Sequence, residues 1–554
     1  MKRIIRQILG WGMMLTLPLV MTSCEWFFDM LDNPITPALQ VLRAQLTLKV
    51  GESKPIQAST QAHVVLLYSS DNPAVATVDA TGLITAVSPG TARITIKAQG
   101  EDDYYRTEIF CENTTTVEVT VTKKDGSISF ATSNVIKSFD DAAFTNPLTI
   151  VGDGTVTYSS NNSNVATVDA NGNVTIVDGG TAIITATTAN TDEYAYKPDY
   201  AQYTLRVIKI IDLSTLTSDY IAQDNNILTG TLAGNYKITI ADNANVELKD
   251  VTINGGNNPF TNWAGLTCDG NATITITGTN TVKGFYREYP AIQAGPIGKT
   301  LTINGTGTLT ATGGDFAAGI GSGRNATCGA ITISGGTVNA NSIKDGAGIG
   351  SGYEDSSCGA ITISGGTVIA SSSDAGAGIG SGYKGSSCGA ITISGGTVTA
   401  SSSGHGAGIG SGFNDSSCGN ITISGGTVIA SSGGHGAGIG SGYNGCSCGH
   451  ITISGGTVYA SSGDAGAGIG SGFNSTFGSI TITAGITQVQ ATTNYFAVWP
   501  IGKGYCDDDS TGAVIINGVT VTSKDWDGTG LSGSGLTLTG AGTNTWTLTS
   551  TTAP

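Results

Sequence analysis

Residues 358–387 read CGAITISGGTVIASSSDAGAGIGSGYKGSS, and this thirty-residue phrase decides the fold. Close copies of it begin at Cys328, Cys388, Cys418 and Cys448, and degenerate copies lie on both sides. Such a period is typical of solenoids and propellers, in which one unit cannot close a hydrophobic core alone. The region therefore has to fold as a stack of similar units.

Each unit holds three short apolar runs separated by turns that contain glycine. Ile331 and Ile333 share one face of the first run, and Val338 and Ala340 share one face of the second, because side chains alternate along a strand. The position between Val338 and Ala340 is Asn, Ile, Thr, Ile and Tyr in the five units, which is the scatter expected of a residue that faces solvent. We predict that Ile331 and its equivalents every thirty residues stack in one inward-facing column.

These features predict an all-β chain whose residues 210–554 form a right-handed parallel β-helix with 30-residue coils, the exact repeats being 328–477. Successive coils would lie about 4.8 Å apart. A β-propeller blade needs four strands in about 40–50 residues, more than one unit provides. The calcium-binding nonapeptide roll needs Gly-Gly-x-Gly-x-Asp, but Ile and Ser stand here where Asp would have to be.

A second repetition lies upstream of the β-helix. Residues 68–92 contain Tyr-Ser-Ser, Val-Ala-Thr-Val-Asp, Gly and Gly-Thr-Ala, and residues 158–182 contain the same elements at the same spacing. Alternating apolar residues and Asp-x-x-Gly turns predict a β-sandwich. These elements resemble the bacterial Ig-like group 2 (BIG2) family over residues 45–124 and 125–209. The resemblance implies two Ig-like β-sandwiches in tandem that act as spacers in a surface protein and contain no catalytic residues.

The N-terminus has the features of an export signal. Three basic residues precede an apolar run in residues 1–23 that is too short to span a bilayer as a helix. The segment Val-Met-Thr-Ser before Cys24 resembles the lipobox of bacterial lipoproteins, which implies that Cys24 is lipidated. We therefore expect a linker over residues 24–44 and a lipid anchor at the bacterial outer membrane or cell surface, without a membrane-spanning segment.

Composition narrows the possible functions. Glycine accounts for 82 of the 554 residues, which argues against helical bundles because glycine destabilises helices. With 25 Lys and Arg against 41 Asp and Glu, the net charge of −16 has the wrong sign for binding nucleic acid. The expected partner is a polysaccharide or another ligand on a host or bacterial surface.

The repeated cysteines form one column. A straight ladder does not converge on a tetrahedral metal position, although neighbouring thiols lie within the distance range of a disulfide. Phe477 stands where the next cysteine would be, which favours a buried apolar position, and Cys446 is the best candidate for a disulfide. The structural ladder comprises Cys328, Cys358, Cys388, Cys418 and Cys448.

A second column is aromatic and is the candidate glycan-contact site. Exposed aromatic rows can bind sugars, but rings one coil apart also lie near the distance for stacking on one another, which would present only their edges. Both interpretations stay open. The column comprises Tyr353, Tyr383, Phe413, Tyr443 and Phe473. The variable polar loops beside it would form one edge of any binding face: Glu354–Asp355, Lys384, Asn414–Asp415 and Asn444.

Few residues suggest catalysis or metal binding. No paired-carboxylate column recurs in the repeats, so we predict that the chain is not an enzyme. His405 and His435, one coil apart at a turn, are a weak metal candidate. We expect no cofactor other than calcium, for which clustered oxygens make Asp507, Asp508 and Asp509 the best candidate.

The phrases ITISGGTV and GAGIGSG resemble the carbohydrate-binding and adhesin-type β-helix domains of bacterial surface proteins. The resemblance implies a lipid-anchored protein that binds polysaccharide or adheres to a surface through the β-helix. Pectate-lyase-like enzymes share this fold, so a polysaccharide lyase or hydrolase is one alternative. It would need clustered acids and a basic residue on one lateral face. A purely structural stalk is the other alternative.

Overall fold

The computed structural model describes residues 36–60, 64–100, 112–255, 260–495, 498–505 and 512–551. The predicted signal peptide and the lipidation residue Cys24 lie outside this set, as do residues 24–35 of the predicted linker. The described chain is all-β, apart from one 3-10 turn, η1 (Leu213–Thr215). In these residues no helix is long and apolar enough to cross a membrane.

The first Ig-like domain is a sandwich of a four-stranded and a three-stranded sheet, in the orders β2-β9-β8-β5 and β3-β7-β6. Ile84, Ile94 and Val119 are completely buried between them. A short pair, β1 with β4, extends the fold into the predicted linker. The strands are β1 (Leu39–Val41), β2 (Gln45–Lys49), β3 (Ser53–Pro55), β4 (Ala58–Thr60), β5 (Val64–Ser70), β6 (Ala76–Val78), β7 (Leu83–Ala86), β8 (Gly90–Gly100) and β9 (Asn113–Thr122).

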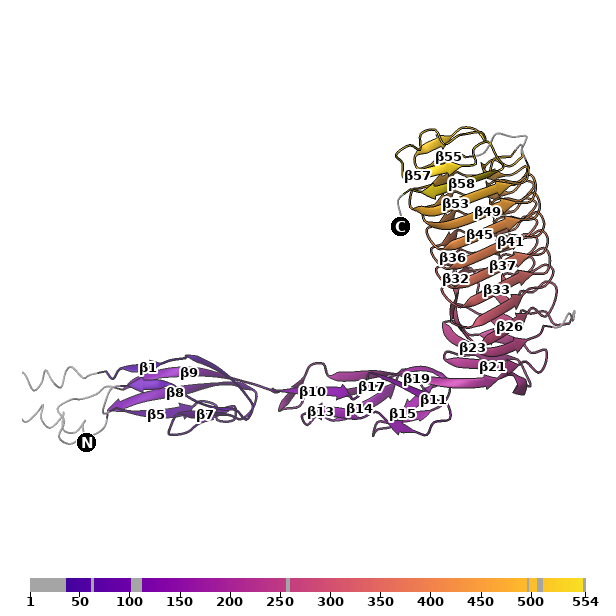
Figure 1. Cartoon of the computed structure of the whole chain (residues 1–554). Helices are drawn as coiled ribbons and strands as arrows, with labels where there is room; N and C mark the ends of the chain where they lie inside the picture. Colours follow the sequence, from indigo (N-terminus) through magenta and orange to yellow (C-terminus); the bar gives the residue numbers. More distant parts are fainter. Residues whose placement is uncertain are drawn as a thin grey trace, which may run out of the picture.

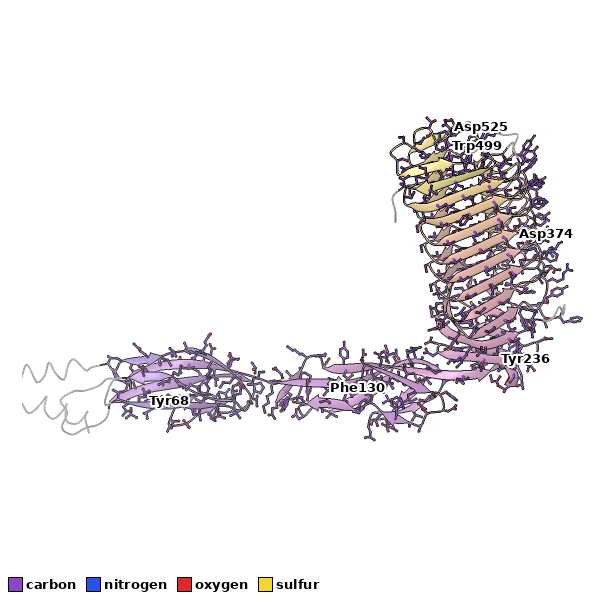
Figure 2. All side chains as sticks on the ribbon, in the orientation of Figure 1. Tyr68, Phe130, Tyr236, Asp374, Trp499 and Asp525 are labelled. Carbon is purple, nitrogen blue, oxygen red and sulfur yellow. The ribbon has the colours of Figure 1, made fainter. Side chains whose placement is uncertain are left out.

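The second Ig-like domain repeats the local chemistry of the first. Asp79 Oδ1 accepts hydrogen bonds from the backbone N–H groups of Thr81 and Leu83, and Asp169 does the same one domain later, so the Asp-x-x-Gly motif is an Asx turn in both copies. The strands are β10 (Lys124–Phe130), β11 (Asn134–Ser138), β12 (Phe144–Thr145), β13 (Leu148–Val151), β14 (Val156–Ser160), β15 (Ala166–Val168), β16 (Asn173–Ile176), β17 (Gly180–Thr188), β18 (Tyr194–Tyr196) and β19 (Tyr200–Asp212). Phe130 meets Tyr203 edge to face in its core, with ring centroids 4.7 Å apart (Figure 2).

Strand β19 joins this domain to the β-helix without a break. Its first part pairs antiparallel with β17, and its last residues pair in parallel with β21 (Asn226–Thr231) of the β-helix. The predicted boundary between residues 209 and 210 therefore falls inside one strand. Figure 1 shows the two Ig-like domains arranged end to end. The β-helix starts at the far end of the second domain, and its axis runs across the direction of the Ig-like domains.

Each coil of the exact repeats contributes strands to separate parallel ladders. One coil consists of β35 (Ser357–Cys358), β36 (Ile361–Ile363), β37 (Thr367–Ser372) and β38 (Ile379–Gly380). The Ile-Gly strands belong to an eleven-stranded sheet that starts at β20 (Tyr220–Ala222) and ends at β54 (Ile501–Gly502). The two-residue strand at the cysteine is a fourth strand beyond the three that the sequence predicts. It forms a six-stranded sheet of its own.

The coil-to-coil register confirms the predicted parallel stacking. Ile331 pairs with Ile361, and Ile361 pairs with Ile391; all three side chains are completely buried. Ile369 and Ile429, at the variable position, are each 42% exposed, as predicted. Within the exact repeats, the longest strands lie together on one side of the β-helix (Figure 1): β33 (Thr337–Ser342), β37, β41 (Thr397–Ser402), β45 (Thr427–Ser432) and β49 (Gly456–Ser462).

The β-helix ends in an antiparallel cap. Its last long parallel strand, β53 (Ile486–Thr493), pairs with β58 (Thr545–Ser550), which runs in the opposite direction and covers the final coil. The cap also contains β55 (Val514–Ile516), β56 (Val519–Val521) and β57 (Leu536–Thr539). Trp546 of β58 is completely buried in the end of the core.

Candidate functional site

The five predicted aromatic side chains form one continuous column. Centroids of neighbouring rings lie 5.0–5.3 Å apart from Tyr353 to Phe473. The ring of Phe413 is nearly parallel to its neighbours on both sides, at 7° and 5°. Phe316 and Tyr505 extend the column at its two ends, with centroids 5.2 and 5.4 Å from the nearest ring. Sequence reasoning missed both because they belong to degenerate coils, although Tyr505 follows the short Ile-Gly-Lys-Gly phrase of its coil.

Stacking covers both faces of Phe413, whereas Tyr353 and Tyr383 are tilted by 41° and Tyr443 meets Phe473 at 74°. Further side chains pack at both ends of the column. The guanidinium carbons of Arg287 and Arg324 lie 5.0 and 5.6 Å from the centroid of Phe316. At the other end, Tyr495 meets Tyr505 at 90°. The five predicted rings are only partly buried, so their edges and the tyrosine hydroxyl groups are what a ligand would meet.

The backbone conformation of the polar loops beside the column explains their composition. Glu354 and Asp355 both have positive φ, at 61° and 51°, and the equivalent residues of the following coils do too. Asn, Asp and Gly tolerate this left-handed conformation best, which explains their recurrence there. The amide of Asn444 donates to Asn414 Oδ1 at 3.0 Å, so these side chains also form a row from coil to coil.

Charged side chains link the first coils of this face. Glu354 lies between Arg324 and Lys384, with N–O distances of 2.7 and 2.8 Å, and Arg324 also reaches Glu288 at 2.9 Å. Hydrogen bonds from Lys384 and Arg324 lower the pKa of Glu354 to about 2. The aromatic column is therefore bordered by ion pairs in its first coils and by the Asn414–Asn444 amide pair in later coils.

Removing one of its two cationic partners should raise the pKa of Glu354 toward its usual value. We expect Arg324→Gln to raise the pKa of Glu354 from about 2 toward the usual 4.5, measured by NMR titration of its side-chain carboxyl. Because the folded-state pKa lies below the unfolded value, the ion pairs stabilise the fold above about pH 4.5, and this contribution is lost as pH falls toward 2. Lys249→Gln, in another part of the β-helix, is the control. An unchanged pKa in Arg324→Gln would contradict the assignment.

His405 and His435 lie beside the aromatic column and stack on each other, with centroids 5.1 Å apart. Burial and the neighbouring His435 lower the pKa of His405. His435 Nδ1 lies 3.2 Å from Asp464 Oδ2. The charge of Asp374, which is labelled at one edge of the β-helix in Figure 2, partly opposes this shift by raising the pKa of His405.

Metal-ligand geometry is not found at these histidines. In the part of the chain that the structure covers, no three His, Cys, Asp or Glu side chains gather in an arrangement that could hold a metal ion. The calcium candidate, Asp507, Asp508 and Asp509, lies outside the described residues.

The cysteine column is a buried ladder of free thiols. All five members are at least nine-tenths buried, and Phe477 takes the register position opposite Cys448. Cys418 Sγ lies 3.2 Å from Cys448 Sγ. The seven cysteines described, these five together with Cys268 and Cys446, are all free.

Cys446 belongs to a different column. Its Sγ lies 3.1 Å from the carbonyl oxygens of both Gly412 and Tyr443. Two coils earlier, Ser386 Oγ donates to the two equivalent carbonyl oxygens. Burial raises its pKa to about 12. The serines at 356, 386 and 416 were the sequence signal for this role.

Family models match three parts of the chain. The bacterial Ig-like domain (group 2) model matches residues 35–106, and the intimin immunoglobulin-like domain model matches residues 150–190. The second module thus matches a different Ig-like model from the first. The beta helix repeat model matches residues 301–324, 331–353, 361–383, 391–413, 421–443 and 451–473. No curated protein matches the chain.

Several solved structures align with about a third of the chain at low sequence identity. Domains 4 and 5 of the S-layer protein SbsC align at 17% identity and a TM-score of 0.19, covering 31% of this chain and 96% of that one. Human protocadherin-24 EC1-2 aligns at 15% identity and 0.17, covering 32% and 99%. Drosophila N-cadherin EC1-4 aligns at 14% identity and 0.16, covering 31% and 49%. The chain thus combines a group 2 bacterial Ig-like domain, a segment similar to the intimin Ig-like domain, and a β-helix repeat region.

Proposed function

We propose that this chain is a lipid-anchored surface adhesin that binds polysaccharide along the edge of its aromatic column. Its Ig-like domains and β-helix support a surface adhesin-like or structural role. In the proposal, Cys24 carries the lipid at the bacterial outer membrane, and the two Ig-like domains hold the β-helix away from it. The chain would act by binding and not by catalysis.

The observation that carries the proposal is the repetition of partly exposed polar groups in register along one face. Tyr383 and Tyr443, two coils apart, are both partly exposed, and the partly exposed amides of Asn414 and Asn444 are hydrogen-bonded to each other in the loops beside them. Hydroxyl and amide groups both donate and accept hydrogen bonds, as sugar hydroxyls require. A polymer with repeating units can meet such a row several times, so weak single contacts add up.

Binding of the full chain to a polysaccharide array tests the proposal. The triple variant Tyr383→Phe, Tyr443→Phe, Asn444→Gly removes three polar groups and should weaken binding about tenfold or more, at a net value of about 1 kcal/mol for each hydrogen bond. Phe413 and Phe473 already occupy this column, and glycine accepts the φ of 63° at Asn444, so the fold should persist.

Thr399→Ala, at the variable position on another face, is the matched control and should bind like the unchanged chain. Absence of polysaccharide binding by the unchanged chain would overturn the proposal. Unchanged binding by the triple variant would show that the column is not the binding face. Release of cleaved or unsaturated sugar products would favour the enzyme alternative instead.

A further inference from the structure

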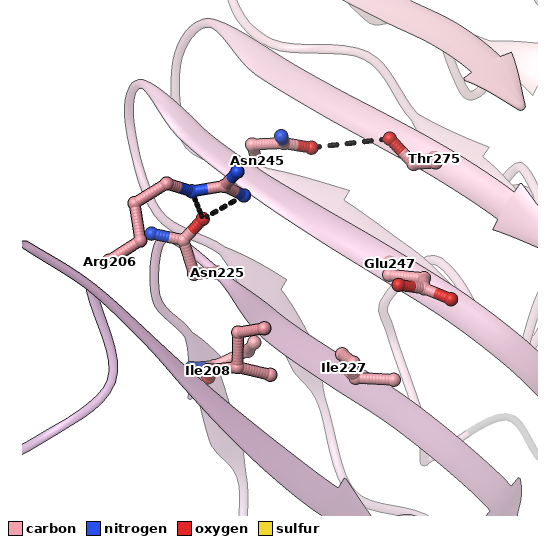
Figure 3. Close-up of a pocket in the computed structure, with 8 residues that line it drawn as sticks. Arg206, Ile208, Asn225, Ile227, Asn245, Glu247 and Thr275 are labelled. Atoms are coloured by element: carbon pink, nitrogen blue, oxygen red, sulfur yellow. Dashed lines mark hydrogen bonds between the residues drawn. The ribbon is translucent and has the colours of Figure 1, made fainter. Parts of the chain in front are cut away.

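A hollow of about 150 Å³ lies where the second Ig-like domain runs into the β-helix. Four neighbouring strands contribute to it, namely β19, β21, β23 (Ala244–Ile253) and β25 (Ala272–Thr277), which pair in that order. We call it the shoulder site. Figure 3 shows its lining residues, among them Arg206, Ile208, Ile227, Asn245, Glu247 and Thr275.

The guanidinium of Arg206 is held in place by hydrogen bonds to Asn225. Its Nε and Nη2 donate to Asn225 Oδ1 at 3.2 and 2.8 Å. Asn225 is 7% exposed, and its amide nitrogen donates to Thr181 Oγ1 at 2.8 Å and to Asp224 Oδ2 at 2.9 Å. These hydrogen bonds fix the orientation of Arg206 and leave its Nη1 for a ligand.

Asn245 and Glu247 are oriented in the same way, each by a threonine of the next coil. Thr275 Oγ1 donates to Asn245 Oδ1 at 3.3 Å, which leaves the Asn245 amide nitrogen. Thr277 Oγ1 donates to Glu247 Oε1 at 2.6 Å, which leaves the second carboxylate oxygen. The hollow therefore presents two donors and one acceptor whose positions are set before any ligand arrives.

The remaining wall is apolar. Figure 3 shows Arg206 and Glu247 on opposite sides of the hollow, with Ile208 and Ile227 along a third side. An apolar surface bordered by fixed donors and an acceptor suits a pyranose ring, whose C–H face packs on aliphatic side chains while its hydroxyls form hydrogen bonds. Arg206 and Glu247 balance each other in charge, so a neutral sugar leaves no net charge in the hollow, whereas a carboxylate-bearing sugar would add a negative charge beside Glu247.

We propose that the shoulder site binds one neutral hexopyranose unit of a glycan. The inference rests on the proposed function for its ligand class, but it uses none of the residues of the aromatic column. A glycan could then contact the chain at two separate places, which would increase its residence on the surface.

Saturation-transfer NMR on the full chain tests the proposal, with methyl glucoside, galactoside and mannoside as neutral probes and methyl glucuronide as the charged one. At least one neutral probe should bind. Glu247→Gln should weaken that binding about tenfold, because it replaces a charged hydrogen-bond acceptor while its side-chain carbonyl can still accept from Thr277. Lys249→Gln on the same strand removes a charge outside the hollow and should leave binding unchanged.

The result distinguishes the two sites. Loss of the signal in Glu247→Gln, with its retention in the triple variant of the aromatic column, supports the shoulder site whether or not the polysaccharide array is positive. The shoulder site is overturned if no neutral probe binds, if Glu247→Gln binds as the unchanged chain does, if the glucuronide binds best, or if the column variant abolishes the signal.

Discussion

Gly410→Ala is expected to lower the free energy of unfolding by about 4 kcal/mol, since it combines backbone strain with a clash in the core of a stacked repeat. The residue has a φ of +139°, and a Cβ atom there would lie 1.7 Å from the carbonyl oxygen of Gly440. That carbonyl is held in place because it accepts a hydrogen bond from the backbone N–H of Ser411 at 3.0 Å. The same packing recurs one coil later, where a Cβ at Gly440 would lie 1.8 Å from the oxygen of Gly470. Each glycine of this column thus packs directly against the backbone of the next coil, which leaves no room for a side chain.

Chemical denaturation of the full chain, followed by circular dichroism, measures this effect. Thr399→Ala is the control in the preceding part of the same coil, at a position that also accepts Asn, Ile and Tyr. It should change stability by no more than about 0.5 kcal/mol. Equal midpoints for Gly410→Ala and Thr399→Ala would show that the coils are less closely stacked than the register indicates.

Trp546→Ala should destabilise the C-terminal cap by about 3–5 kcal/mol, the usual cost of removing a large buried aromatic side chain. Trp546 is completely buried and lies 6.1 Å from Trp526, measured between ring centroids. Its strand, β58, covers the edge of β53. Loosening the cap would expose that edge, and unpaired strand edges promote association between chains.

Two measurements check the cap prediction. Thermal unfolding should show a new transition at lower temperature, and light scattering after size-exclusion chromatography should show oligomers at concentrations where the unchanged chain has none. Thr547→Ala, the neighbouring residue on the outward face of β58, should do neither. A monomeric Trp546→Ala chain with unchanged melting would exclude a role for this side chain in protecting the edge.

The repeated parts of the fold could be predicted because their signal is periodic. The thirty-residue recurrence places Ile331, Ile361 and Ile391 in one buried column, and Phe477 in place of a cysteine indicates that its column is buried. Sequence spacing also brings the aromatic rings together. It does not determine their interplanar angles, which range from 5° to 74° between neighbouring rings of the predicted column.

The shoulder site could not be predicted because it has no period. Arg206, Asn225 and Glu247 lie in the last Ig-like strand and in the first, irregular coils, and none of the three recurs thirty positions later. Their proximity depends on β19 continuing from one fold into the next. The sequence patterns change near residue 210, so a pattern-based boundary falls inside that strand, close to its C-terminal end.

Strand β19 also determines how this chain would respond to pulling. Along its length it is bonded to β17 from Tyr200 to Val207, and from Lys209 it is bonded to the first coil. Under the proposed function, tension between an N-terminal anchor and a ligand on the β-helix would pass through this strand. The hydrogen bonds to its neighbours on either side would then carry the load together, so the joint would resist force through backbone hydrogen bonding.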